Sequence, residues 1–308
     1  MQSSVLASLR SAPGFISGEA LARSLGVSRV AVWKQIRELR ALGYDIQASS
    51  RGYRLDSSPD LLLPGEFPGW ESRVHHAFIM DSTMHRARDL ARGGAAEGTL
   101  VIAEQQTAGR GRLDRSWLSP AGGIYMTLIT RPAAAPAQAP RINLLAGVVV
   151  ADAIERLHSL PARVKWPNDV LVDGRKVCGI LAEMDAECDA VRFVNVGLGL
   201  NANSYVAQQQ PTGVSLRELL GAPVDRVRLV RCIVEGICDA LPQLTSDALL
   251  ERWRSRTATI GREVSIVTGG VTVSGVAVDV TSSGALLVRD AAGTTHEVVA
   301  GDCVHRVN

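Results

Sequence analysis

EQQTAGRGR (Glu104–Arg112) and VKWPNDVLVDGRK (Val164–Lys176) are the two most informative strings of this chain. Each concentrates Arg, Lys or Gln among Gly and other small residues. Glycine lets the backbone approach a ligand closely, and Arg and Lys can hold an anionic group. Together the strings predict a site that holds a buried anionic intermediate.

Short apolar strands and helices surround both strings, and this order predicts an α+β or mixed-sheet domain in which helices bury one face of the strands. The expected strands are Arg73–Met80, Thr99–Glu104, Ile124–Thr130, Ala162–Lys165, Val170–Val172, Gly179–Met184 and Phe193–Leu198. The expected helices are Met84–Gly93 and Arg141–Leu157.

The first string ends in GRGR (Gly109–Arg112), which lacks the third glycine of a dinucleotide fingerprint. Its two arginines offer rigid donor forks for a phosphate or a carboxylate. The next residues, Leu113–Pro120, add Arg115 and Trp117 and suit a mobile flap over a ligand. A basic surface turn is the alternative interpretation of GRGR alone.

The second string places Asn168 and Asp169 on a backbone that Pro167 constrains and Trp166 anchors. A short Val/Leu strand and an Asp-Gly turn separate Asp169 from Lys176, so the chain can bring the two together. One interpretation is an exposed salt bridge, which contributes little. The other is a buried lysine beside a reacting phosphoryl or acyl group.

Residues 20–43 read as a helix-turn-helix. We expect a helix at Gly18–Leu25, capped by Ser17 and broken by Gly26, and a second helix from Ser28 to Leu42. A β-hairpin at Tyr44–Leu55 would add a wing. In the second helix one face is expected to be core, and its members are Val32, Ile36 and Leu39. The alternative is a small three-helix packing module with a solvated basic face.

Charge favours the DNA-binding interpretation of this module. Residues 1–55 carry a net charge of +5, which leaves −3 for the rest of a chain whose total is +2. A local basic excess is expected where phosphates are bound. Helix residues would read base edges while wing arginines hold phosphates. The expected DNA-binding residues are Ser28, Arg29, Lys34, Arg37, Arg51 and Arg54.

The remaining segments complete a division into residues 1–62, 63–258 and 259–308. Asp56–Gly69 contains three prolines and two glycines, which indicates a linker. After Thr259 short strands separated by Gly-rich turns predict an SH3-like β-barrel with a packing role. Its expected strands are Glu263–Val267, Val271–Asp279, Ala285–Arg289 and Thr295–Val299.

Composition excludes several classes of protein. The chain has 308 residues, 46% of them hydrophobic and 21% charged, as in an ordinary globular protein with a sizeable core. Its longest apolar stretch, Leu144–Ala151, is far shorter than the ~20 residues that span a bilayer. The N-terminus shows no secretory signal, and no CxxC or HExxH spacing predicts a metal site. We expect a cytoplasmic protein with reduced thiols at Cys178, Cys188, Cys232, Cys238 and Cys303.

The motifs occur in the order and spacing of biotin protein ligases. They are Asp81-Ser82-Thr83, EQQTAGRGR, KWPNDV, DGRKVCGIL and GLGLN (Gly197–Asn201). With the winged helix in front, the whole chain resembles the bifunctional type, which also represses the biotin operon.

The resemblance implies a two-step reaction with Mg²⁺ and ATP. The biotin carboxylate attacks the α-phosphate of ATP, which gives biotinyl-5′-adenylate and releases pyrophosphate. A lysine of a biotin carboxyl carrier protein then attacks the mixed anhydride, takes the biotin and releases AMP. The implied catalytic residues are Arg112, Asp169 and Lys176. The implied biotin-binding residues are Ser82, Thr83, Met84, Gln106, Gly109, Arg110, Gly111, Arg112 and Lys176. The implied ATP- and adenylate-binding residues are Arg112, Arg115, Trp117, Asn168, Lys176 and Asn201.

One position departs from the family pattern. Many relatives carry Asn after the Ser-Thr pair, whereas this chain has Met84 followed by His85. Methionine cannot supply an amide contact. A backbone group or His85 could replace it, or the contact could be absent.

The resemblance also implies a homodimer when the adenylate is bound, with operator DNA as partner and no membrane contact. Two further hypotheses stay open: a ligase whose winged helix no longer regulates, and a ligand-sensing DNA-binding regulator without ligase activity. Retained Arg112, Asp169 and Lys176 argue against the sensor. A lipoate ligase is less favoured because GRGR and KWPND are strings of the biotin type.

Overall fold

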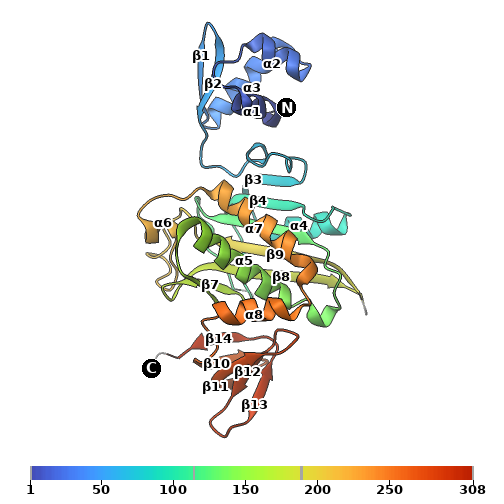
Figure 1. Cartoon of the computed structure of the whole chain (residues 1–308), viewed down its shortest axis with the longest axis vertical. Coiled ribbons are helices and arrows are strands. Elements are labelled where there is room, and N and C mark those ends of the chain that lie inside the picture. Colours follow the sequence, from blue (N-terminus) through green and yellow to red (C-terminus); the bar gives the residue numbers. More distant parts are fainter. Residues whose placement is uncertain (1, 114, 188–189, 307–308) are drawn as a thin grey trace. The chain divides into compact units, whose positions relative to one another are not determined.

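The computed structural model describes residues 2–113, 115–187 and 190–306. The predicted thiol at Cys188 lies outside these residues, as does Asp114 of the expected flap. The chain divides into two compact units, residues 1–76 and residues 77–308 (Figure 1). The proposed boundaries at residues 62 and 258 stay a prediction.

The first unit contains the expected helix-turn-helix and wing. Its elements are α1 Gln2–Ser11, α2 Gly18–Leu25, α3 Arg29–Ala41, β1 Asp45–Ser49 and β2 Gly52–Ser57. Both predicted caps are confirmed: Ser17 Oγ accepts a hydrogen bond from the Ala20 amide at 3.0 Å, and Ser28 Oγ accepts one from the Ala31 amide at 3.1 Å. The expected core face of α3 is buried. It packs in a cluster with Val5, Leu6 and Leu9 of α1.

The expected linker is partly packed structure. A short 3₁₀ helix forms at Pro64–Glu66, and Leu62 and Phe67 are fully buried. Glu66 pairs with Arg10 at 2.5 Å and accepts a hydrogen bond from the Tyr44 hydroxyl. The linker prediction is therefore wrong for residues 62–67. It relied on the prolines and glycines and did not take into account the apolar residues between them, which are buried.

The second unit is built on a seven-stranded sheet of order β3-β4-β5-β9-β8-β7-β6. The β4–β5, β5–β9, β9–β8, β8–β7 and β7–β6 pairs are antiparallel. Its strands are β3 Val74–Met80, β4 Leu100–Gln106, β5 Ile124–Thr130, β6 Ala162–Lys165, β7 Asp169–Val172, β8 Arg175–Ala186 and β9 Val191–Leu200. All seven were predicted, although β8 and β9 are longer than expected.

Helices cover both faces of this sheet, whereas the sequence predicted helices on one face only, because α4 and α5 each bury an apolar side against it. On one face Ala87 and Ala91 of α4 (Thr83–Arg92) pack with Ile129 and Phe193. On the other face Gly147 of α5 lies against the side chains of β6 and β8, and α7 and α8 lie beside α5 (Figure 1). The remaining helices are α5 Arg141–His158, α6 Leu216–Leu220, α7 Arg226–Ala240 and α8 Asp247–Arg256, with short 3₁₀ turns at Pro136–Gln138 and Leu241–Gln243. Among the helices that the structure describes, none is long and apolar enough to cross a membrane.

A five-stranded antiparallel sheet of order β13-β12-β11-β10-β14 ends the chain, in agreement with the expected SH3-like domain. Its strands are β10 Glu263–Thr268, β11 Val271–Val280, β12 Leu286–Arg289, β13 Thr295–Val298 and β14 Asp302–His305. Strand β14 was not predicted, and it is the one that reaches the candidate site.

Candidate functional site

Most of the residues implied by the sequence line one cavity of about 830 Å³ in the second unit. This volume lies within the range usual for small-molecule sites. The predicted residues that line it are Ser82, Thr83, Met84, Gln106, Arg110, Gly111, Arg112, Arg115, Trp117, Asn168, Asp169 and Lys176.

One end of the cavity is neutral and polar. The Thr83 amide donates to Gln106 Oε1 at 2.9 Å, and Thr127 Oγ1 lies 2.9 Å from Thr83 Oγ1. Gln106 Nε2 donates to Ser119 Oγ at 2.9 Å, while Ser82 caps α4 by accepting from the Met84 amide. The helix start, the end of β4 and the middle of β5 thus hold neutral donors and acceptors in fixed positions.

Glycines form the floor of the cavity. A Cβ added at Gly199 would collide with the indole of Trp117, and one at Gly179 would lie 2.8 Å from Trp117 Cζ3. At Gly197 an added Cβ would lie 2.6 Å from Cε of Met84. The GLGLN motif and Gly179 are therefore needed where the chain approaches closely.

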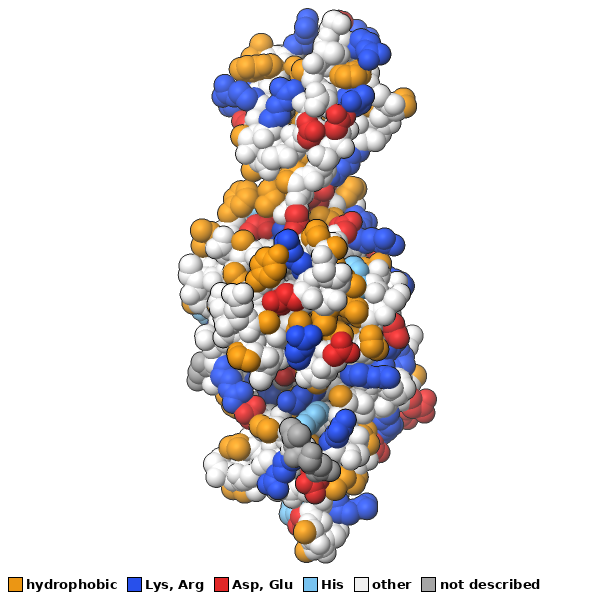
Figure 2. All heavy atoms as spheres, turned by 90° about the vertical axis from the view of Figure 1, so that its left-hand side faces the viewer, with side chains coloured by type: hydrophobic (Ala, Val, Ile, Leu, Met, Phe, Trp, Pro, Cys, Tyr) orange, Lys and Arg blue, Asp and Glu red, His pale blue; other side chains and the backbone are white. Residues whose placement is uncertain are grey.

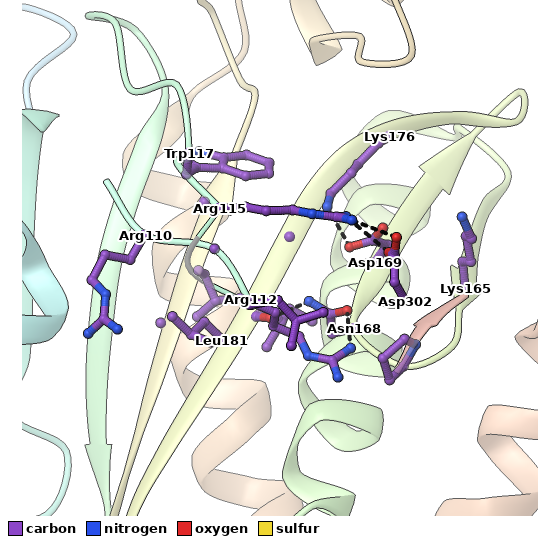
Figure 3. A pocket seen from close by; sticks show the side chains of 18 of the residues that line it. Arg110, Arg112, Arg115, Trp117, Lys165, Asn168, Asp169, Lys176, Leu181 and Asp302 are labelled. Atoms are coloured by element: carbon purple, nitrogen blue, oxygen red, sulfur yellow. Dashed lines mark hydrogen bonds and ion pairs between the residues drawn. The ribbon is translucent and has the colours of Figure 1, made fainter. Parts of the chain in front are cut away.

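The other end is charged. Lys176 Nζ lies 2.6 Å from Asp169 Oδ1, which confirms the predicted approach across the strand and turn. Both side chains are largely buried, and the Lys176 ammonium also stands 5.2 Å from the ring centroid of Trp117 (Figure 3). This pair is therefore a cavity wall and not the exposed hairpin salt bridge of the alternative interpretation.

Arg112 lies beside this pair. Its Nη1 donates to Asn168 Oδ1 and to the Gly301 carbonyl, each at 3.3 Å. Asn168 Nδ2 in turn donates to the Ile180 carbonyl at 2.6 Å, so Asn168 orients the guanidinium (Figure 3). Burial lowers the pKa of Arg112 from its usual value, yet a guanidinium stays charged at neutral pH.

The C-terminal sheet supplies part of the wall, which goes beyond the packing role that the sequence predicted. Asp302 of β14 accepts two hydrogen bonds from Arg115, at 3.0 and 2.6 Å. The hydrogen bond from Arg115 lowers the pKa of Asp302. Burial raises the pKa of the Cys303 thiol to about 11 and lowers that of His305 to about 4.

Four of the residues singled out in the sequence lie or point elsewhere. Gly109 does not line the cavity, because it packs against Trp117 and Ser119, where an added Cβ would collide with the Trp117 carbonyl oxygen. Asn201 is buried outside the cavity lining, where its Nδ2 donates to the carbonyl oxygens of Lys176 and Val214 at 3.4 and 3.3 Å. His85 faces Asp81 at 2.9 Å and does not line the cavity, so it does not replace the missing amide. The Arg110 guanidinium lies apart from Lys176 and Asp169 (Figure 3). It pairs with Glu183, 3.0 Å away, which also pairs with Arg88.

Four lining residues of note were not predicted from the sequence. Lys165 and Thr127 line the cavity, and so do Asp302 and His305. Lys165 opens the KWPND string, so its neighbours in the sequence could have identified it. The β14 residues carried no local signal, since their place depends on how the C-terminal sheet docks.

The N-terminal unit has a basic surface. On the face seen in Figure 2, Lys and Arg side chains of this unit outnumber the acidic ones. All six predicted DNA-binding residues are exposed. On α3 the Arg37 guanidinium lies 5.1 Å from the ring centroid of Trp33, whose side chain is 53% exposed beside Val30 at 74%. Helix α3 thus offers cationic and apolar groups together, which suits contact with base edges.

The wing arginines are held by an aromatic ring. The guanidinium groups of Arg51 and Arg54 lie 4.8 and 4.9 Å from the ring centroid of Phe15. Arg54 also pairs with Asp56 at 2.6 Å. Gly52 at the tip has φ 121°, and an added Cβ would collide with the Ile16 backbone, so only glycine fits this turn.

Comparisons with known proteins agree along most of the chain. The HTH domain family matches residues 2–54, the biotin/lipoate A/B protein ligase family residues 76–201, and the biotin protein ligase C terminal domain residues 259–306. The bifunctional ligase/repressor BirA of Bacillus spizizenii is 38% identical over 91% of this chain and 90% of its own length. This chain belongs to the bifunctional biotin ligase/repressor family.

A more distant relative and a solved structure are also similar to this chain. The Escherichia coli BirA is 32% identical over 89% of this chain and 88% of its own. A solved biotin protein ligase from Aquifex aeolicus, in complex with biotin and ATP, is 27% identical with a TM-score of 0.64. It covers 76% of this chain and 99% of its own length.

Proposed function

We propose that this family member is an ATP-dependent biotin protein ligase and a biotin-responsive repressor of biotin synthesis genes. In the first role it forms biotinyl-5′-AMP and transfers biotin to a lysine of a biotin carboxyl carrier protein in the cytoplasm. The observation that carries the proposal is the single cavity in which a neutral polar end faces Arg112, Lys176 and Asp169.

The charged end fits adenylate formation. Attack of the biotin carboxylate on the α-phosphate brings two anionic groups together and develops further negative charge. Among the described lining residues, five are cationic and two are carboxylates, so the wall attracts such a centre. Asn168 and Asp169 orient Arg112 and Lys176 in advance, so these two cations can stabilise the transition state without reorganising.

The neutral end fits biotin. The ureido ring is uncharged but strongly polar, and burying it requires matching donors and acceptors. Thr83 and Gln106 supply these groups, while Ser82 and Met84 hold the start of α4 in place. Gly111 lines the cavity between this end and Arg112.

The adenylate needs protection, because a mixed anhydride hydrolyses in water. Trp117 packs over the glycine floor, and Arg115 ties the same segment to Asp302. This arrangement makes Arg115–Pro120 a cover that excludes water from the reacting centre.

Magnesium fits this site as a partner of ATP. Among the described residues no cluster of three metal-ligating side chains exists, but Mg²⁺ bound with nucleotide phosphates takes only one or two protein carboxylates. Asp169 and Asp302 are the carboxylates that would hold it. The ion would neutralise charge on the phosphates.

For the repressor role, α3 and the wing would contact operator DNA, and the adenylate would act as corepressor by favouring a homodimer. Two protomers present two reading helices, which match a palindromic operator. A gel-shift assay with a fragment upstream of biotin synthesis genes tests this role. Binding that biotin and ATP leave unchanged would contradict the coupling.

Biotin-dependent exchange of labelled pyrophosphate into ATP tests the first chemical step. Exchange that requires biotin supports the ligase. Folded protein that binds biotin but shows no exchange would favour the ligand-sensing regulator instead. The meeting of Lys176, Asp169 and Arg112 in one cavity is the reason that we favour the enzyme.

A further inference from the structure

A buried amide without a partner lies beside the cavity. Asn195 of β9 is fully buried, and neither its Nδ2 nor its Oδ1 has a hydrogen-bond partner among the described residues. Buried amides are nearly always paired, because an unpaired one loses its hydrogen bonds with water without replacement. The position therefore calls for a polar group that the described residues do not provide.

Asn195 points to the face of the sheet that carries the cavity. Successive side chains of a strand alternate between faces, so residues 193, 195, 197 and 199 share one face. Phe193 packs against α4 on this face, and Gly197 and Gly199 form the cavity floor. Asn195 is thus the next residue along the floor, under the helix that also carries Thr83 and Met84.

The cross-strand neighbours of Asn195 confirm this placement. Glu183 of β8 is directly opposite it and pairs with Arg110, which lines the cavity. One step back toward the cavity, Gly197 lies between Leu181 on β8 and Thr127 on β5, and both of these line the cavity.

The side chain of Met84 closes the cavity at this point. Its Cε lies against Gly197, 2.6 Å from the position of an added Cβ. Methionine is unbranched and has three rotatable bonds, so it changes conformation easily. Turning Met84 away from Gly197 would extend the neutral end of the cavity to Asn195, close to the hydrogen-bonded threonines Thr83 and Thr127.

We propose that Asn195 is a specificity-determining residue that hydrogen-bonds the ureido ring of biotin once Met84 turns away from Gly197. The inference rests on the proposed ligase function. A carboxamide has donors and an acceptor, and so does the ureido ring, so each satisfies the other. The amide from β9 would then replace the one that Met84, on α4, cannot supply.

Asn195→Leu tests the proposal because leucine has nearly the shape of asparagine but no polar atoms. Biotin binding to the full chain is measured by calorimetry without ATP. We expect Kd for biotin to rise at least tenfold. Kd for ATP should stay at the wild-type value, and the thermal midpoint should stay at or above the wild-type value. Sites that hydrogen-bond a substrate lose this much when one partner is removed.

Asn143→Leu is the matched control. Asn143 lies on α5, over the opposite face of the sheet, and its Oδ1 also lacks a partner. This change should leave Kd for biotin unaltered. Equal losses in both variants would mean that a general effect of removing a buried amide is responsible, and would overturn the proposal.

Two analogues locate the contact. Desthiobiotin keeps the ureido ring and should lose the same factor as biotin in Asn195→Leu, whereas lipoic acid, which lacks that ring, should bind both proteins alike. An unchanged Kd for biotin in the folded variant would remove Asn195 from the site. If the leucine variant does not fold, Asn195→Ser is measured by the same criteria.

Failure of this inference is distinguishable from failure of the proposed function. Wild-type protein that does not bind biotin would contradict the ligase itself. If the wild-type protein binds biotin and the Asn195→Leu variant binds it equally tightly, only the role of Asn195 is contradicted.

Discussion

Arg115 and Asp302 are joined by two hydrogen bonds, of 3.0 and 2.6 Å, across 187 residues of sequence. One residue belongs to the segment that covers the glycine floor, and the other begins β14 of the C-terminal sheet. The pair makes the C-terminal sheet a part of the candidate active site. Each partner shifts the pKa of the other toward the charged form, since the hydrogen bond raises that of Arg115 and lowers that of Asp302.

Asp302→Asn should loosen the cover without unfolding the protein. Arg115 is well exposed, so we expect the pair to contribute at most about 1 kcal/mol, and the thermal midpoint should change little. If the closed state of the cover loses this stabilisation, biotinyl-5′-AMP should be released about five times faster. Release of labelled adenylate from the isolated complex measures this. An unchanged half-life of the protein–adenylate complex would mean that the Arg115–Asp302 pair does not hold the cover closed.

Lys176→Ala should slow adenylate formation by about a hundredfold or more, because it removes a preoriented charge from the reacting centre. Single-turnover formation of biotinyl-5′-AMP is the measurement. Arg175→Ala changes the adjacent exposed cation of β8 and serves as the control. If Lys176→Ala formed adenylate at the wild-type rate, Lys176 would have no part in the mechanism.

The strings around residues 104–112 and 164–176 were sufficient to predict most of the site. Their function depends on local backbone, as in the turn that Pro167 constrains and in the approach of Lys176 to Asp169, and local backbone follows from local sequence. Some strand limits were predicted closely for the same reason: Ile124–Thr130 and Ala162–Lys165 agree at both ends, although β8 and β9 extend beyond their predicted limits.

Features that depend on distant contacts were not predictable. Asp302 reaches the cavity only because the C-terminal sheet packs beside it, and Asn195 reads as an ordinary strand residue until α4 is placed. Helix α7 is a different case. Its buried apolar residues recur at helical spacing, so the pattern was present in the sequence and was not used. They are Leu229, Val230, Ile233, Val234 and Ile237.

Lys34→Ala and Arg37→Ala should weaken binding to operator DNA and reduce its dependence on salt. Each bound phosphate releases counterions, so the slope of log K against log salt should fall by about 1 for every phosphate that the variant no longer holds. Gel shifts at several salt concentrations test this. Arg289→Ala, an exposed change in the C-terminal sheet, should leave the slope unaltered. Identical slopes in wild type and all three variants would contradict phosphate binding by the α3 surface.

Stability should fall as the pH is lowered from about 6.5 toward 4. Burial, with Lys165 and Arg262 nearby, lowers the pKa of His305 to about 4 in the folded chain. Between the two pKa values the unfolded chain holds the extra proton, so acid favours unfolding. The contribution of neutral His305 to the free energy of unfolding is complete above its pKa in the unfolded chain. It is lost as the pH falls through its pKa in the folded chain.

Thermal midpoints of wild type and His305→Gln at a series of pH values from about 7.5 down to about 4.5 measure this effect, because the series spans most of the interval between the two pKa values. Glutamine can keep a hydrogen bond with Thr259 but does not titrate in this range. The variant should lose less stability than wild type on acidification. Parallel curves for the two proteins would mean that His305 does not titrate as described.

The most direct test of the central claim is transfer of labelled biotin to a purified biotin carboxyl carrier domain. The reaction is run with Mg·ATP and, as a control, with ATP omitted. We predict labelling of the carrier lysine that depends on ATP and disappears in Lys176→Ala. Folded wild-type protein that binds biotin but never labels the carrier would contradict the assignment of this cavity as a biotin ligase site.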